Sequence, residues 1–162
     1  GDGQITEADK YIYHSRDPKV VFTWNNTFNY KNWDFGMVLR ANIGNWVYND
    51  FEAANTSISS TSSAPLSNLM SNRFLFNDLG VRGVQSDYFV RNASFLRCDN
   101  ITIGYTWPNL LNDALRLRLY GAVQNPFVIT KYNGLDPEVF GGIDNAVYPR
   151  PVTVSFGIVA QF

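Results

Sequence analysis

The chain contains five stretches in which apolar and polar residues alternate with a period of two. They lie at 19–31, 33–44, 99–107, 115–127 and 152–162. In the last stretch, one side carries Val152, Val154, Phe156, Ile158, Ala160 and Phe162. Because successive side chains of a β-strand point to opposite faces, this period predicts strands with one apolar and one polar face, whereas helical spacing fits the stretches badly.

The connections between these stretches alternate between short and long. The short ones are Lys31–Asn32 and 108–114, and the long ones are 49–88 and 129–150. In a sheet whose strands run up and down, every second connection leaves from the same side. We therefore expect both long connections at one end of the sheet and both short ones at the other. The first long connection contains the Ser-, Thr- and Asn-rich stretch 55–68, which is typical of an exposed, mobile loop.

Brief turns at one end and long loops at the other are typical of β-barrels of the bacterial outer membrane. A tilted strand needs roughly 9–11 residues to cross a bilayer, and the alternating stretches are about that long or longer. In such a barrel the apolar face contacts lipid and the polar face lines a wet lumen. Aromatic residues near the short turns are expected to form the inner girdle, namely Phe28, Tyr30, Trp33, Phe35, Tyr105, Trp107 and Phe162. The predicted fold class is therefore an all-β, antiparallel, up-and-down transmembrane barrel of the outer membrane, with its strands at 19–162 after an outer loop at 1–18.

Five strands do not close a barrel, since bacterial single-chain barrels have even numbers of roughly eight or more and lipid does not tolerate open sheet edges. Two alternatives remain: a soluble β-sandwich, or a piece of a larger barrel. Aromatic residues make up 15% of the 162 residues, which favours β-structure in either case. The balance of 13 basic and 14 acidic residues argues against nucleic-acid binding. The single cysteine excludes an internal disulfide, and no apolar run is long enough to indicate a membrane helix.

The first ten residues, GDGQITEADK, match the second part of an EF-hand-type calcium loop. Aligning Gly3 with the invariant glycine of that loop places Asp2 before the turn and Asp9 at the last ligand position. We therefore predict that Asp2, Gln4 and Asp9 contribute to a Ca²⁺ site in an acidic outer loop. The alternative is an ordinary Asp-Gly turn. The first ligands of the pattern would precede Gly1, which favours a piece of a longer chain.

Several blocks resemble the C-terminal part of SusC-like TonB-dependent transporters of the Bacteroidetes outer membrane. The blocks are GDGQITEADK (1–10), DPKVVFTWNNTFNYKNWDF (17–35), DYFVRNASFLRCDNITIGYTWP (87–108), LRLYGAVQNPFVITKYNGLDPEV (117–139) and GGIDNAVYPRPVTVSFGIVAQF (141–162). Their order and spacing match the family over nearly the whole chain, except at 49–86. The departures are Cys98, where an aliphatic residue is more usual, and the missing front of the acidic loop.

The resemblance implies a barrel of about 22 strands, of which this chain would hold the last five. The remaining strands and an N-terminal plug would lie elsewhere in the same protein. Such proteins import oligosaccharides, or sometimes peptides, with energy delivered by TonB, and they usually work with a SusD-like surface lipoprotein. Phe162, a terminal aromatic on an amphipathic strand, also resembles the sorting signal that the barrel-assembly machinery of outer membranes reads.

Substrate contact is expected from the outer loops and the upper lumen, where aromatic rings stack on sugars and Asn or Asp side chains bind hydroxyl groups. The candidates are Trp46, Tyr48, Phe51, Tyr132, Asn133 and Asp144. The alternative role for each is loop packing or contact with the lid protein. The rival functions for the chain are a secreted soluble β-sandwich that binds carbohydrate, and a complete small barrel that acts as an adhesin or passive pore.

The remaining residues with reactive or ionisable side chains do not indicate an enzyme. His14 is the single histidine, and the serines at 57–63 have no histidine partner. Cys98 is in the polar phase and is expected to point into the lumen. Arg97 and Asp99 fall in the lipid-facing phase. Either they lie near the outer interface, where charge costs about 0–1 kcal/mol, or a bulge shifts the phase of the strand.

Overall fold

The computed structural model describes residues 6–54, 86–110 and 114–162. More than half of these residues are in β-strands, and short helical turns lie beside the strands. No helix in the described ranges is long and apolar enough to cross a membrane. Asp2 and Gln4 of the predicted calcium loop, and the Ser- and Thr-rich stretch 55–68, lie outside the described residues.

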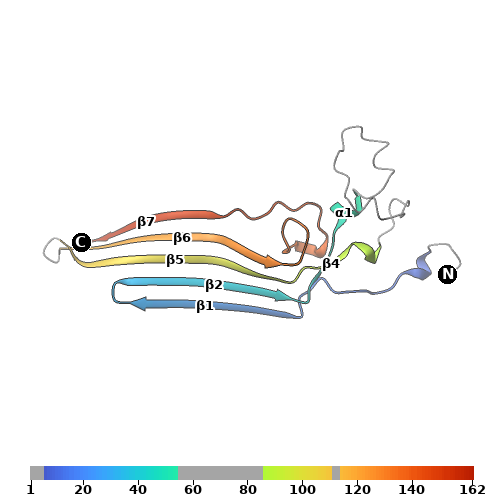
Figure 1. Ribbon diagram of the computed structural model, residues 1–162, viewed down its shortest axis with the longest axis horizontal. Helices are drawn as coiled ribbons and strands as arrows, with labels where there is room; N and C mark the ends of the chain where they lie inside the picture. The colour runs from blue at the N-terminus through green and yellow to red at the C-terminus, as the bar shows by residue number, and fades with distance from the viewer. Residues whose placement is uncertain (1–5, 55–85, 111–113) are drawn as a thin grey trace, which may run out of the picture.

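Five long strands form one antiparallel sheet (Figure 1). They are β1 (Val20–Tyr30), β2 (Trp33–Ile43), β5 (Phe95–Leu110), β6 (Leu115–Thr130) and β7 (Thr153–Gln161), in the order β1-β2-β5-β6-β7. Each strand pairs with the next long strand in the sequence, so the predicted up-and-down arrangement is confirmed. Two strands are longer than predicted, because β5 begins at Phe95 and β6 continues to Thr130.

The two long connections leave from the same end of the sheet, as predicted. Figure 1 shows the C-terminus at the end where β1 turns into β2, and the N-terminus at the opposite end, beside the small elements that follow β2 and β6. The β1–β2 turn is tight, and Lys31 takes the positive φ of 53° that two-residue hairpin turns require. We call this end the turn end and the opposite end the loop end.

The two faces of the sheet differ in polarity. On the apolar face, one row of paired residues runs across all five strands, formed by Phe28, Phe35, Ile103, Gly121 and Phe156. Phe22, Ile103 and Phe156 are 54%, 51% and 85% exposed. Because no second layer of described residues covers this face, the alternative of a β-sandwich with these side chains in a dry core is wrong.

The polar face carries the alternate residues of each strand. The next row across the sheet is formed by Asn29, Asp34, Gly104, Tyr120 and Gly157. Glycine or a polar side chain therefore stands at this level on every strand. This division into an apolar and a polar face is the one that a lipid-facing and a lumen-facing surface require.

A bulge in β5, which the sequence pattern left open as an alternative, decides on which face of the sheet Arg97 and Cys98 lie. The register between β2 and β5 breaks between Cys98 and Asn100 and leaves Asp99 without an opposite residue. Since a bulge reverses the alternation, Arg97 lies on the polar face, as the bulge alternative predicted. Cys98 lies opposite Leu39 on the apolar face. The prediction that Cys98 points into the lumen is therefore wrong.

At the loop end, a second and smaller sheet pairs β3 (Trp46–Tyr48) with β4 (Val90–Asn92). The helical turns beside the strands are η1 (Glu7–Asp9), α1 (Asp50–Ala54), η3 (Asp87–Phe89) and η4 (Phe140–Gly142). Val47, Ala93 and Tyr132 form a small hydrophobic core here. The strands β3 and β4 lie outside every strand that the sequence pattern predicts, because three-residue strands are too short to show a period.

Candidate functional site

Charged side chains gather on the polar face at the loop end, where the segment after β6 folds over the strands. Arg40 of β2 donates to Asp99 of the β5 bulge from Nε at 3.0 Å and from Nη2 at 3.2 Å. The same guanidinium donates to the two carboxylate oxygens of Glu138, at 2.8 and 3.0 Å. Arg40 therefore ties two neighbouring strands to the loop that follows β6.

A second ion pair lies beside the first and is buried. Arg97 of β5 donates from Nη2 to Asp136 at 2.6 Å. Arg40 and Arg97 both lie within cation–π range of the buried ring of Phe95, with their Cζ atoms 5.6 and 5.5 Å from its centroid. A buried charge without a partner is strongly destabilising, so Asp136 is a required anchor for the loop.

Glu138 accepts from a third arginine as well, since Arg150 donates to it from Nη1. Burial raises the pKa of the Glu138 carboxyl, but hydrogen bonds from Arg40 and Arg150 outweigh burial and leave the pKa below its ordinary value. The carboxylate therefore stays ionised at neutral pH and holds the loop. We call the six residues of this network the loop-end cluster: Arg40, Arg97, Asp99, Asp136, Glu138 and Arg150.

Another ion pair lies on the polar face nearer the turn end. Arg118 of β6 donates to Asp34 of β2 at 3.0 and 2.6 Å, although β5 separates their strands. Gly104 of β5 makes this contact possible, because a Cβ at this position would lie 2.5 Å from Asp34 Oδ1 and 2.7 Å from Arg118 Nη2. The ring of Tyr120 lies 4.9 Å from the Arg118 guanidinium and covers Gly157 in the same way. Glycines on the polar face thus let long side chains lie flat along the sheet.

The structure brings four of the six predicted substrate-contact residues together around Asp144. The Tyr132 hydroxyl donates to Asp144 Oδ2 at 2.6 Å. The Asp144 N–H donates to the Tyr48 carbonyl at 2.8 Å, and the Phe51 N–H donates to the Asp144 carbonyl at 3.0 Å. Burial and the hydrogen bond to Asp144 raise the pKa of the Tyr132 hydroxyl, which keeps it a neutral donor. These contacts join β3, α1 and the loop after β6, and contact with a substrate stays a prediction.

The other two predicted residues make none of these contacts with Asp144. Trp46 stacks on His14, with ring centroids 3.7 Å apart and planes at 11°. The Trp46 N–H also donates to the Ser15 carbonyl at 3.1 Å, so the segment before β1 is fastened to β3. Asn133 is exposed.

The predicted calcium site falls largely outside the part of the chain that the structure describes. Asp9 accepts hydrogen bonds from the Thr6 N–H at 2.7 Å and from the Thr6 hydroxyl at 3.2 Å. Within residues 6–54, 86–110 and 114–162, no group of three or more His, Cys, Asp or Glu side chains is arranged to hold a metal ion. Since Asp2 and Gln4 lie outside these ranges, the calcium site stays a prediction.

The loop-end cluster could not be predicted from the sequence pattern. Three of its pairs join residues that lie 39, 59 and 98 positions apart, and a fourth joins Glu138 to Arg150 at 12 positions, so no local spacing marks them. One feature of the sequence does point to it. Arg97 and Asp99 are charged residues at positions that the alternation assigns to the apolar face, and such charges require either ion-pair partners or a bulge. The structure contains both.

No protein-family model matches the chain. Curated relatives do match over its whole length. The chain is 43% identical to the TonB-dependent receptor SusC of Bacteroides thetaiotaomicron, of which it covers 17%. It is 27% identical to the TonB-dependent receptor P3 of Formosa agariphila, of which it covers 18%. The chain therefore spans less than a fifth of the length of these relatives.

Solved structures show the same fold. The RagAB peptide importer in the open-open state superposes with a TM-score of 0.77 at 22% identity, over 96% of this chain and 18% of that one. The closed-closed state of the same importer superposes with a TM-score of 0.74 over 99% of this chain. The five-stranded sheet thus occurs as one portion of a much larger chain.

Proposed function

We propose that the chain is a segment of a SusC-like TonB-dependent receptor, a β-barrel protein of the bacterial outer membrane, and that it supplies part of the wall and outer rim of a nutrient importer. The single observation that carries this proposal is the one-layer sheet with its exposed apolar face and its polar, ion-paired face. A wall between lipid and an aqueous lumen needs both faces. The relatives are receptors and transporters, which supports a role without enzymatic chemistry.

The proposed mechanism is gated transport without a covalent step. A ligand is captured at the loop end, a plug that lies outside this chain is displaced with energy from TonB, and the ligand is released inward. The cargo is an oligosaccharide or a peptide. The similarity to SusC supports the receptor class, and the peptide importer RagAB has the same fold. This segment would contribute a fixed rim, because the loop-end cluster ties the loop after β6 to two strands of the wall.

We also propose a SusD-like surface lipoprotein as partner at the loop end. Large apolar side chains stand exposed there on the loop after β6, namely Leu135, Phe140 and Tyr148. The loop-end cluster holds this loop in place, so these side chains are presented on a fixed base.

Phe162 is exposed beyond the end of β7, and its role as a sorting signal for the barrel-assembly machinery stays part of the proposal. Binding of Ca²⁺ at Asp2, Gln4 and Asp9 is also part of the proposal.

Uptake by cells tests the proposed function. The gene for the intact receptor is deleted and restored on a plasmid, and uptake of labelled oligosaccharides and peptides is measured with and without TonB. We expect the deletion to abolish concentrative uptake of one cargo class, and the plasmid to restore it only when TonB is present. Uptake that is unchanged by the deletion, or that needs no TonB, would contradict the importer.

A further inference from the structure

Asn26 is a polar side chain in the middle of the apolar face. Its row across the five long strands is formed by Asn26, Met37, Ile101, Val123 and Val154. Along β1, the other residues of this face are Val20, Phe22, Trp24, Phe28 and Tyr30. At a tilted rise of roughly 2.5 Å per residue, Asn26 lies about 10 Å from Tyr30, within an apolar band roughly 25 Å tall. The alternation therefore places an amide where the wall contacts hydrocarbon.

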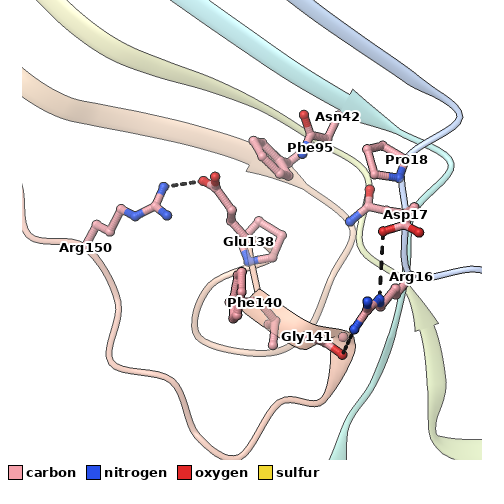
Figure 2. Close-up of a pocket in the computed structure, with 13 residues that line it drawn as sticks. Arg16, Asp17, Pro18, Asn42, Phe95, Glu138, Phe140, Gly141 and Arg150 are labelled. Atoms are coloured by element: carbon pink, nitrogen blue, oxygen red, sulfur yellow. Dashed lines mark hydrogen bonds and ion pairs between the residues drawn. The ribbon is translucent and has the colours of Figure 1, made fainter.

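An amide in hydrocarbon needs a hydrogen-bond partner, because an unpaired polar group is costly there. Charged groups elsewhere in this wall have such partners. Figure 2 shows Arg150 donating to Glu138 beside a cleft at the loop end, and Arg118 donates to Asp34 on the polar face. The Asn26 side chain, in contrast, forms no hydrogen bond with any residue that the structure describes. A partner for it therefore has to come from outside the described residues.

The position of β1 in the sheet shows from which side that partner comes. On the β2 side, Met37 lies directly opposite Asn26, and Phe35 and Leu39 are its diagonal neighbours, so all three are apolar. On the other side, β1 is the end strand of the sheet and has a free edge. Because lipid does not tolerate an open edge, another strand of the receptor pairs with β1 there. That strand brings the side chains that can reach the Asn26 amide.

We propose that Asn26 hydrogen-bonds to an uncharged polar side chain that stands directly opposite it, on the receptor strand that pairs with the free edge of β1. The inference rests on the proposed function, in which this chain is part of a closed wall in the membrane. The amide oxygen accepts and the amide nitrogen donates, so serine, threonine, asparagine or glutamine satisfies it. A charged partner is excluded by the cost of a charge facing lipid at this depth.

Such a pair also fixes how the two strands align. A slip of one residue would move every side chain of the neighbouring strand to the other face. A slip of two residues would keep the faces but would separate the two polar side chains and leave both unpaired in hydrocarbon. Asn26 thus acts as a register determinant at the place where this chain joins the rest of the wall.

Disulfide mapping in the intact receptor identifies the opposite residue while Asn26 stays in place. In a cysteine-free background, F28C is combined in turn with single cysteines along the neighbouring strand, and the receptor is oxidised in native membranes. Because the pairing is antiparallel, the residue opposite Asn26 stands two positions after the one that crosslinks best to F28C. We expect serine, threonine, asparagine or glutamine there. An apolar or charged residue at that position, or no crosslink to this strand within one receptor molecule, would overturn the proposal.

The stability of N26L gives a second reading, which depends on the sign of the change. Leucine removes the amide from the apolar face but leaves the opposite polar side chain without its partner. We therefore expect the urea midpoint of the receptor in lipid vesicles to fall. M37L is the matched control, since Met37 lies in the same row and has no polar partner there, and its midpoint should stay unchanged.

An N26L midpoint that rises or stays the same would show that the amide faces lipid alone, and would overturn the proposal. If N26L does not fold, the disulfide map still decides, because it retains Asn26. No uptake is measured in either experiment, so their failure leaves the importer proposal untouched. Loss of the importer proposal in the uptake experiment would, in turn, leave a mapped pair of side chains in place.

Discussion

Glu138 and Arg40 are joined by two hydrogen bonds of 2.8 and 3.0 Å, although 98 residues separate them in the sequence. Their contact fixes the loop after β6 to the wall of the sheet. We expect E138Q to free this loop, because Arg40 and Arg150 both lose a charged acceptor. The expected loss is about 1.5–3 kcal/mol of local stability, the worth of hydrogen bonds to a charged group. Hydrogen exchange of the backbone amides at 131–150 in the intact receptor measures it.

The matched control for this variant is D17N. Asp17 is exposed and its nearest charged partner, Arg16, is 3.8 Å away, so its charge should contribute little. Equal exchange rates in E138Q and the wild-type receptor, or an equal effect of D17N, would show that the ion pairs do not hold the loop.

Loop attachment should also depend on pH through the same carboxyl. The pKa of Glu138 is lower in the folded protein than its ordinary value of 4.5. Its contribution is therefore complete above that ordinary value and is lost as the pH falls through the lower, folded value. We expect amide protection at 131–150 to hold from neutral pH down to that ordinary value and to fall as the pH is lowered further. In E138Q this part of the pH dependence should be absent, and a profile identical to that of the wild-type receptor would contradict the assignment to Glu138.

Gly104 and Gly36 both lie on the polar face, but only Gly104 is crossed by an ion pair. A Cβ at Gly104 would lie 2.5 Å from Asp34 Oδ1, whereas a Cβ at Gly36 would have its nearest neighbour, the Thr102 Cβ, at 4.0 Å. We expect G104A to separate Asp34 from Arg118 and to lower stability by about 1–3 kcal/mol, as is typical for loss of such a contact. G36A should change it by less than about 0.5 kcal/mol. Thermal unfolding followed by circular dichroism compares the two, and equal midpoints would contradict the close passage at Gly104.

The long strands were predictable because each keeps its alternation over many residues. A strand with one face toward lipid and one toward water must place its apolar residues at every second position. For the same reason the apolar row through Phe35, Ile103 and Phe156 follows directly from the pattern. The limits of β5 were less predictable, since the bulge at Asp99 reverses the phase and the alternation no longer marks the beginning of the strand at Phe95.

The loop-end contacts were beyond the reach of the sequence pattern for a different reason. Tyr132 and Asp144 were predicted as substrate contacts of the outer loops, which stays a prediction, and nothing local indicates that they bond to each other 12 residues apart. The pairing of Arg40 with Glu138 depends on how the segment after β6 folds over β2. The path of that segment depends on tertiary contacts, and the alternation of apolar and polar residues does not predict it.

A charge introduced at neighbouring residues of β7 should cost different amounts of folding free energy on the two faces of the sheet. Phe156 lies on the apolar face opposite Gly121, and Ser155 lies on the polar face opposite Ala122. We expect F156R to destabilise the folded receptor by about 2–4 kcal/mol, as for a charge facing lipid near the bilayer midplane. S155R places the same charge in the lumen and should cost much less. Unfolding in urea, with the receptor in lipid vesicles, measures both, and equal costs would argue against opposite environments.

The most direct test places a fluorescent probe on each face in turn. In a C98S background of the intact receptor, single cysteines replace Ile103 and Phe156 on the apolar face, and Thr102 and Ser155 on the polar face. The labelled receptors are placed in vesicles and exposed to a quencher carried on lipid acyl chains or to aqueous iodide. We expect the lipid quencher to reach the probes at 103 and 156, and iodide to reach those at 102 and 155. The reverse pattern, or protection of 103 and 156 from the lipid quencher, would contradict the assignment of the apolar face to the membrane.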